Sequence, residues 1–154
     1  MIYLDTCLVI YLVEDAERGP HVRELLARHG HEEFAISPLV RLECLVGPLR
    51  SRDPELEDRY RGALDLFVEL PLDATAFERA ARLRASSSLR TPDTLHLAAA
   101  QVHGCTALWT NDSRLAVAGR GLAVDGLHGG CPGRAVRRGA SGSVGSRGGR
   151  GGAA

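Results

Sequence analysis

The 154-residue sequence contains no lysine, so all 19 of its basic side chains are arginines. It also has no Cys-x-x-Cys pair, which excludes a zinc ribbon and a thioredoxin-type redox motif. The four cysteines are instead scattered along the chain, at Cys7, Cys44, Cys105 and Cys131. We interpret them as reduced thiols of a cytoplasmic protein, with Cys131 exposed near the C-terminus.

Long hydrophobic runs are absent as well. The longest, residues 7–13, is far shorter than the roughly 20 apolar residues that a membrane-spanning helix needs. The N-terminal residues 1–5 contain no basic segment and reach an acid at once, so we expect no signal peptide and no membrane association.

Charge is distributed unevenly although the net charge is zero. Residues 129–154 hold five arginines, ten glycines and no acid, whereas residues 1–128 hold 14 arginines against 19 acids. A Gly/Arg-rich segment buries too little apolar surface to offset its ordering entropy. We therefore predict one folded, acidic domain over residues 1–128 and a flexible basic tail over 129–154.

Short apolar runs alternate with helical patterns along the predicted domain. Such alternation is typical of parallel crossovers in an α/β protein, and it predicts a three-layer α/β/α sandwich. The predicted strands cover residues 2–4, 34–36, 67–70, 107–110 and 122–124. The predicted helices cover residues 6–13, 20–30, 38–46, 54–66, 74–89 and 93–103, with a short one after Asp112.

Four acidic residues occur where they could meet at one end of such a sheet. Asp5 ends the first strand, Asp112 follows the fourth, Asp93 opens a helix, and Glu43 lies in an apolar helical stretch. Ligands of open parallel sheets bind beyond the carboxyl ends of the strands. Clustered carboxylates repel one another unless a cation neutralises them, and hard oxygen ligands select Mg²⁺ or Mn²⁺.

Each of these acids also has a purely structural interpretation. The three aspartates could cap or stabilise helix N-termini, and Glu43 could form a salt bridge with Arg41 or Arg50. His96 follows Asp93 by three residues, which fits either a metal ligand or a core histidine that donates to a carbonyl or carboxylate. Spacing alone does not decide between these alternatives.

Four segments in order resemble the PIN-domain ribonucleases, and more narrowly the VapC-type toxins of prokaryotic toxin–antitoxin pairs. They are Leu-Asp-Thr at 4–6, Val-Arg-Leu-Glu at 40–43, Thr-Pro-Asp-Thr-Leu-His-Leu-Ala at 91–98 and Leu-Trp-Thr-Asn-Asp at 108–112. The resemblance covers roughly residues 1–125. It departs from the family at Cys7, where a serine is common and a thiol is a poorer hydrogen-bond donor.

The resemblance implies a five-stranded parallel sheet of order 3-2-1-4-5 and an acidic pocket that binds Mg²⁺ or Mn²⁺. It further implies cleavage of RNA by metal-activated water, a homodimer, and a VapB-like antitoxin whose C-terminal segment enters the pocket. The matching core acids are Asp5, Glu43 and Asp93, with Asp112 as a fourth. The matching supporting residues are Thr6, Thr110 and Asn111.

We expect Asp5 and Asp93 to bind the metal directly, Glu43 to orient or deprotonate the attacking water, and Asp112 to hold a water or a second metal. Candidate contacts to RNA phosphates are Arg90, Arg114 and Arg41, which lie beside these acids in the sequence. The tail arginines could add nonspecific affinity or merely keep the chain soluble. Few aromatics are present, so the sequence offers little support for a stacking platform.

Two other functions compete with the ribonuclease. A HAD-like phosphatase also begins with a strand ending in Asp, but it needs a second Asp where Cys7 stands and a lysine that this chain lacks. A catalytically silent PIN-fold binding module is disfavoured because all four acids are present. The sequence therefore favours a cytoplasmic, metal-dependent endoribonuclease of the toxin type.

Overall fold

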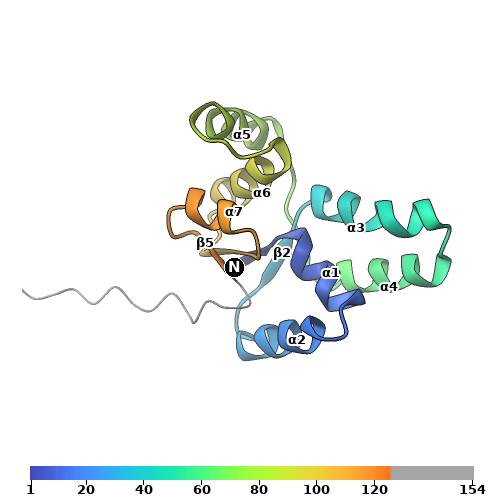
Figure 1. Ribbon diagram of the computed structural model, residues 1–154. Helices are drawn as coiled ribbons and strands as arrows, with labels where there is room; N and C mark the ends of the chain where they lie inside the picture. Colours follow the sequence, from blue (N-terminus) through green and yellow to red (C-terminus); the bar gives the residue numbers. More distant parts are fainter. Residues whose placement is uncertain (126–154) are drawn as a thin grey trace, which may run out of the picture.

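The computed structural model describes residues 1–125 and contains one parallel five-stranded sheet (Figure 1). Its order is β3-β2-β1-β4-β5, which confirms the order that the family resemblance implies. β1 occupies the centre, where Ile2 pairs with Phe34 on one side and Ala107 on the other. The strands are β1 (Ile2–Leu4), β2 (Phe34–Ile36), β3 (Val68–Glu69), β4 (Ala107–Thr110) and β5 (Ala123–Asp125).

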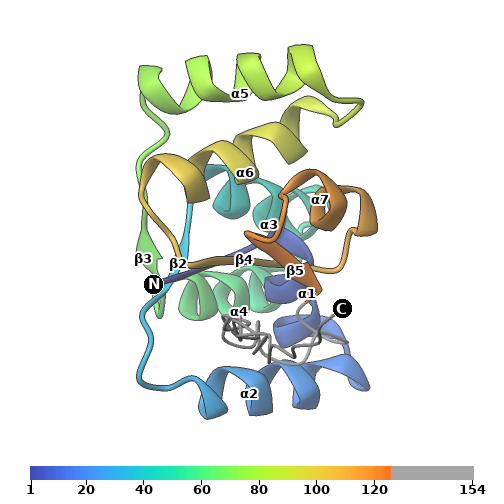
Figure 2. The same cartoon turned by 90° about the vertical axis from the view of Figure 1, so that its left-hand side faces the viewer.

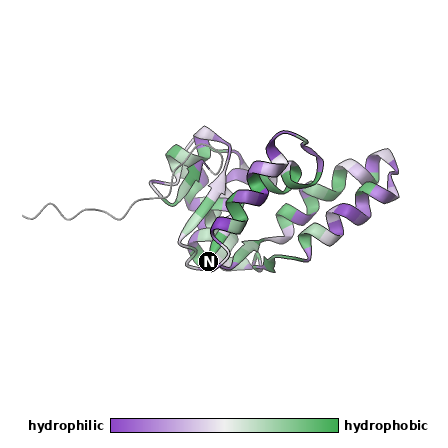
Figure 3. Cartoon of the chain, turned by 90° about the horizontal axis from the view of Figure 1, so that it is seen from below, coloured by the Kyte–Doolittle hydropathy of each residue, from purple (hydrophilic) through white to green (hydrophobic). Residues whose placement is uncertain are grey.

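Helices cover both faces of the sheet, so the predicted three-layer α/β/α sandwich is confirmed. Figure 2 shows α5 and α6 on one side of the strands and α2 and α4 on the other. α3 and α4 pack against each other and extend together away from the sheet (Figures 1 and 3). The helices are α1 (Thr6–Glu14), α2 (Arg18–Arg28), α3 (Pro38–Ser51), α4 (Pro54–Leu64), α5 (Ala74–Ser86), α6 (Thr91–Val102) and α7 (Ser113–Ala118).

Several helices begin at an aspartate whose carboxylate accepts a backbone N–H that the helix leaves unpaired. Asp53 accepts from Leu56, and Asp73 accepts from Ala76 in the same way. Asp5 and Asp112 cap α1 and α7. The structural interpretation of these two acids is thus correct, and it does not exclude a second role because a carboxylate has further lone pairs.

Two helix ends differ from the sequence prediction. α3 continues to Ser51, past the predicted end at residue 46, because Pro48 is buried in the packed helix and the left-handed Arg52 (φ 56°) ends it instead. α5 ends at Ser86 rather than near residue 89. There the hydroxyl groups of Ser86 and Ser87 donate to carbonyls of the preceding turn, which competes with continued helix.

The hydrophobic core lies around the two central strands and the inner faces of the helices. Complete burial of one such apolar side chain contributes about 1.5–3 kcal/mol to folding. Figure 3 shows this apolar interior beneath a largely hydrophilic surface. Fully buried side chains include Tyr3, Leu4, Ile36, Leu64, Leu97 and Leu108.

Within residues 1–125, no helix is long and apolar enough to cross a membrane. The same residues contain three free cysteines, Cys7, Cys44 and Cys105. The predicted tail, residues 129–154, lies outside the described residues, as does the predicted domain boundary at residue 128.

Candidate active site

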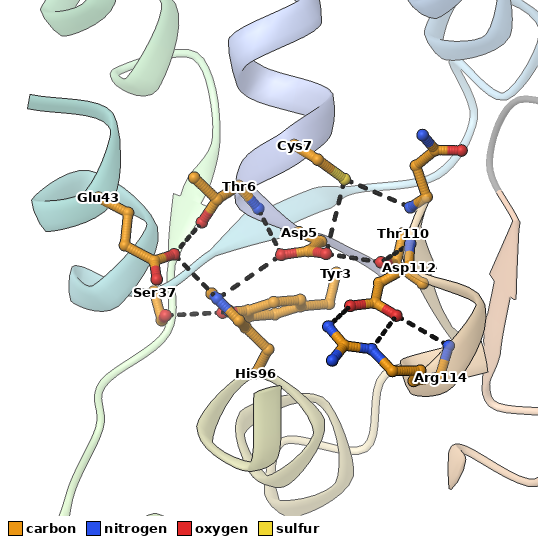
Figure 4. Close-up of polar contacts among 11 residues, drawn as sticks. Tyr3, Asp5, Thr6, Cys7, Ser37, Glu43, His96, Thr110, Asp112 and Arg114 are labelled. Carbon is orange, nitrogen blue, oxygen red and sulfur yellow. Dashed lines mark hydrogen bonds and ion pairs between the residues drawn. The ribbon is translucent and has the colours of Figure 1, made fainter. Parts of the chain in front are cut away.

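Three of the four predicted acids line one open cavity at the carboxyl ends of β1 and β4. The cavity has a volume of about 680 Å³, and Asp5, Glu43 and Asp112 all contribute to its wall. Figure 4 shows their side chains converging from the end of β1, from α3 and from the start of α7. This is the sheet edge at which ligands of open parallel sheets bind. We call it the carboxylate cavity.

Asp5 is held by donors on both of its oxygens. Its Oδ1 accepts the backbone N–H of Thr6 at 2.7 Å, and its Oδ2 accepts the hydroxyl of Thr110 at 2.6 Å. The thiol of Cys7 donates to the same Oδ2 at 3.5 Å. Burial raises the pKa of Cys7 to about 12, with a smaller effect from the charge of Asp5, so the thiol stays protonated and able to donate. Cys7 therefore retains the supporting contact that the departure from serine put in question.

Glu43 faces Asp5 across the ring of His96. The His96 Nε2 lies 3.1 Å from the Glu43 Oε2 and 3.6 Å from the Asp5 Oδ1, and the hydroxyl of Thr6 also donates to Glu43. Burial by itself raises the pKa of Glu43, but the hydrogen bonds from His96 and Thr6 together outweigh it and leave that pKa below its ordinary value. Glu43 is thus a partly buried but ionised carboxylate.

His96 is the residue that joins the two carboxylates, and a chain of hydrogen bonds fixes its orientation. Its Nδ1 lies 3.0 Å from the Tyr3 hydroxyl, which in turn lies 2.6 Å from the Ser37 hydroxyl. Carboxylates only accept, so the Nε2 carries the hydrogen, and in the neutral ring Nδ1 accepts from Tyr3. Burial above all raises the pKa of Tyr3, which keeps its phenol protonated as this donor.

The interpretation of His96 as a core histidine that donates to a carboxylate is confirmed, since the residue is only 3% exposed. The sequence signal for its role was the spacing from Asp93. The participation of Tyr3 and Ser37 had no sequence signal, because both residues occur in ordinary strand-end positions.

Asp112 lies at the opposite wall of the cavity from Glu43. Its carboxylate caps α7 and pairs with Arg114, with 2.7 Å between the Arg114 Nη2 and the Asp112 Oδ2. This hydrogen bond from the guanidinium holds the pKa of Asp112 below its usual range. The Asp112 N–H donates to the Thr110 hydroxyl at 3.0 Å, so one threonine connects Asp112 with Asp5.

Asn111 connects β4 with α1 through two hydrogen bonds. Its backbone N–H donates to the Cys7 sulfur at 3.3 Å, and its side-chain amide donates to the Tyr11 hydroxyl at 2.9 Å. All three predicted supporting residues, Thr6, Thr110 and Asn111, thus lie at the cavity and hold its carboxylates or its wall in place.

Asp93 is the one predicted acid that does not line the carboxylate cavity. It lies in the first turn of α6, one turn before His96, and its Oδ2 accepts the backbone N–H of Arg90 at 2.9 Å. Its charge adds to that of Asp112 in raising the pKa of Arg114, which places it in the same neighbourhood. The structure therefore brings Asp5, Glu43 and Asp112 to one cavity, with Asp93 beside it.

The predicted RNA-contacting arginines differ in how far their charge is balanced. Arg41 binds two acids, Asp65 at 3.1 Å and Glu69 at 2.8 Å, and not Glu43. Arg114 is paired with Asp112. Within the described part of the chain, the Arg90 side chain has no ion pair, which leaves it available to a phosphate.

The donor set of the cavity fits a hard divalent cation better than zinc. Its charged groups are carboxylates, and Mg²⁺ is commonly held by one or two carboxylates together with water and substrate phosphates. Asp5 and Glu43, which His96 holds close together, are such a pair. Among residues 1–125, no group of three or more His, Cys, Asp or Glu side chains is arranged to enclose an ion, so any cation here would keep open positions.

The chain belongs to the PIN domain family, whose model matches residues 2–121. No curated protein matches it in sequence. The family model includes all four predicted acids and the whole sheet apart from β5.

Solved structures of similar fold come from toxin–antitoxin complexes. A chain of a toxin–antitoxin complex from Klebsiella pneumoniae is 26% identical with a TM-score of 0.65, over 82% of this chain and 98% of that one. A chain of VapBC2 from Rickettsia felis, bound to a DNA fragment from its promoter, is 22% identical with a TM-score of 0.61, over 73% and 88%. A chain of FitAcB from Neisseria gonorrhoeae is 20% identical with a TM-score of 0.69, over 83% and 99%.

Proposed function

We propose that this protein is a metal-dependent endoribonuclease and the toxin of a VapBC-like toxin–antitoxin pair. PIN domains are generally metal-dependent nucleases, and the chain belongs to that family. The observation that carries the proposal is the carboxylate pair Asp5 and Glu43 at the open carboxyl end of the sheet, with Asp112 in the same cavity. The substrate that we infer is single-stranded or looped RNA.

The side chains of the cavity suggest a division of labour. A bound Mg²⁺ or Mn²⁺ would neutralise the carboxylates and acidify a water molecule for attack on a phosphodiester. Asp5, whose donors fix both its oxygens, is the proposed ligand, and Asp93 remains the predicted second one. Glu43 is ionised and can orient or deprotonate the attacking water, while His96 holds it in place. Asp112 would hold a further water or cation.

An antitoxin partner is supported by an apolar stripe on α3 at the mouth of the cavity. Leu42, Val46 and Leu49 recur at helical spacing and are 60%, 41% and 55% exposed. Leu42 and Val46 also line the carboxylate cavity. An exposed apolar stripe that reaches a functional cavity is typical of a peptide-binding surface. We propose that a VapB-like antitoxin segment covers it, in a homodimeric toxin acting in the cytoplasm, where the free cysteines stay reduced.

The proposal is tested with Asp5→Asn, which removes one charge at nearly constant shape. We expect the parent protein, purified free of antitoxin, to cleave RNA with Mg²⁺ or Mn²⁺ and to stop when a chelator is added. Asp5→Asn should lower the cleavage rate by about 100-fold or more, since a metal site supplies several kcal/mol. The rate is followed on a labelled transcript in a gel.

The matched control is Asp58→Asn on α4, which removes the same charge from an exposed position far from the cavity lining. It should cleave like the parent. Full activity of a folded Asp5→Asn protein would overturn the proposal. Hydrolysis of small phosphate esters without RNA cleavage would point to the phosphatase instead.

A further inference from the structure

A second cavity, separate from the carboxylate cavity, lies among α5, α6 and the end of α7. Its volume is about 320 Å³, and three arginines line it: Arg79, Arg82 and Arg120. Arg79 and Arg82 come from successive turns of α5, and Arg120 follows α7. We call it the basic cavity.

The positive charge of the basic cavity is not balanced by neighbouring acids. Arg79 donates to the neutral Gln101 amide at 2.7 Å, and neither Arg82 nor Arg120 forms an ion pair within residues 1–125. All three are exposed. On a domain whose acids outnumber its arginines, three unpaired guanidinium groups around one hollow mark a site for an anion.

The basic cavity is connected to the carboxylate cavity by a third hollow along α7. This hollow, of about 460 Å³, shares Ser87, Leu89 and Ala118 with the basic cavity. At its other end it shares Ser113 with the carboxylate cavity, and Arg114 lies beside that position. Three adjoining hollows thus form a continuous path from the carboxylates to the unpaired arginines, which suits an extended chain.

The chemistry of the basic cavity favours phosphate groups of such a chain. Guanidinium groups bind phosphate through two parallel N–H donors. The hydroxyl groups of Ser86 and Ser87 already donate to backbone carbonyls, so the arginines are its available donors. None of the residues that line this cavity is aromatic, and stacking on bases is therefore not part of its recognition.

We propose that the basic cavity binds backbone phosphates of the same RNA strand that the carboxylate cavity cleaves, independently of base sequence. The proposal rests on the proposed nuclease function and adds the course of the strand, which runs from the carboxylates along α7 to Arg82 and Arg120. An acidic peptide is the competing occupant. It is disfavoured because the apolar stripe that suits a peptide lies on α3, at a different wall of the carboxylate cavity.

The test compares R82Q/R120Q with R50Q/R52Q in the full chain. Arg50 and Arg52 are also exposed and without an ion pair among the described residues, and Arg52 shares the left-handed backbone of Arg120, with φ angles of 56° and 47°. Both variants thus lose the same charge at one ordinary and one left-handed position. Matched thermal unfolding establishes that both fold.

The measurement is fluorescence anisotropy of a labelled oligouridylate of about 12 nucleotides, a length within the usual range of single-strand sites. It is made with a chelator, so that no cleavage occurs, across a series of salt concentrations. R82Q/R120Q should bind about tenfold more weakly at low salt, and its slope of log affinity against log salt should fall by about two, one for each lost phosphate contact. R50Q/R52Q should match the parent.

Equal affinity and equal salt slope for the two double variants would overturn the proposal. So would a loss confined to an oligoglutamate probe, which would assign the basic cavity to an acidic peptide. Failure of the nuclease function is distinguished by adding Mn²⁺ in place of the chelator. If the parent then leaves the RNA intact while R82Q/R120Q still loses two contacts, the RNA site stands and the nuclease assignment falls.

Discussion

At the scale of single residues, Glu43 and Asp5 show how a buried hydrogen-bond network keeps carboxylates ionised and close together. Burial opposes the charge of Glu43, yet the donors His96 and Thr6 more than compensate. Asp5 receives its donors from Thr6, Cys7 and Thr110. The network leaves the remaining lone pairs of both carboxylates for a cation in the cavity.

Cys44, on α3 next to Glu43, allows a test of the electrostatics inside the domain. Burial, assisted by the charges of Glu43, Glu14 and Asp5, raises the pKa of Cys44 from 9.0 to about 12. A raised pKa in the folded state means that this contribution to stability is complete below about pH 9 and is lost as the pH rises toward 12. In that window it changes the free energy of unfolding by at most about 1.4 kcal/mol per pH unit.

We therefore expect Cys44→Ala to lose less stability than the parent between pH 8 and 10.5, as measured by urea unfolding under reducing conditions. The substitution also removes packing, so the comparison concerns the change with pH and not the absolute stability. An identical alkaline loss in both proteins would contradict the assigned burial of the thiol.

At the scale of secondary-structure elements, the end of α7 and the start of β5 are the most tightly constrained connection. A Cβ added at Gly119 would lie 2.4 Å from the Ala123 Cβ and 2.8 Å from the Ala123 backbone nitrogen. That backbone cannot move without shifting β5, which pairs with β4. Gly62 on α4 is the opposite case, because a Cβ there would meet nothing within 4 Å.

Gly119→Ala should lower the free energy of unfolding by about 1–3 kcal/mol, since it overpacks a rigid contact. Gly62→Ala is the matched control and should raise it by about 0.5–1 kcal/mol through helix propensity. Chemical denaturation of the two variants and the parent provides the comparison. A neutral Gly119→Ala would show that the connection between α7 and β5 is looser than the structure has it.

The sequence sufficed for the elements but not for the partners of the site residues. Alternating apolar runs and helix caps located the strands, and the strand ends located Asp5 and Asp112. The contact between Glu43 and His96 joins residues 53 positions apart, and it depends on how α3 packs against α6. Local spacing carries no information about that packing, nor about the two acids that Arg41 binds instead.

At the scale of the whole molecule, charge and shape together suggest how an acidic domain approaches RNA. The carboxylate cavity is negative and needs a cation to accept a phosphate. The basic cavity along the same path supplies positive charge without one. The basic cavity escaped sequence analysis because Arg79, Arg82 and Arg120 come from two separate elements, whereas Arg41, Arg90 and Arg114 drew attention by lying next to acids in the chain.

The most direct test of the central claim is a titration of the full chain with Mn²⁺, followed by electron paramagnetic resonance of the free ion. The account predicts a site that Asp5→Asn and Glu43→Gln each weaken by at least about tenfold, while Asp58→Asn leaves it unchanged. Mn²⁺ affinity that is the same in the parent, Asp5→Asn and Glu43→Gln proteins would contradict the account.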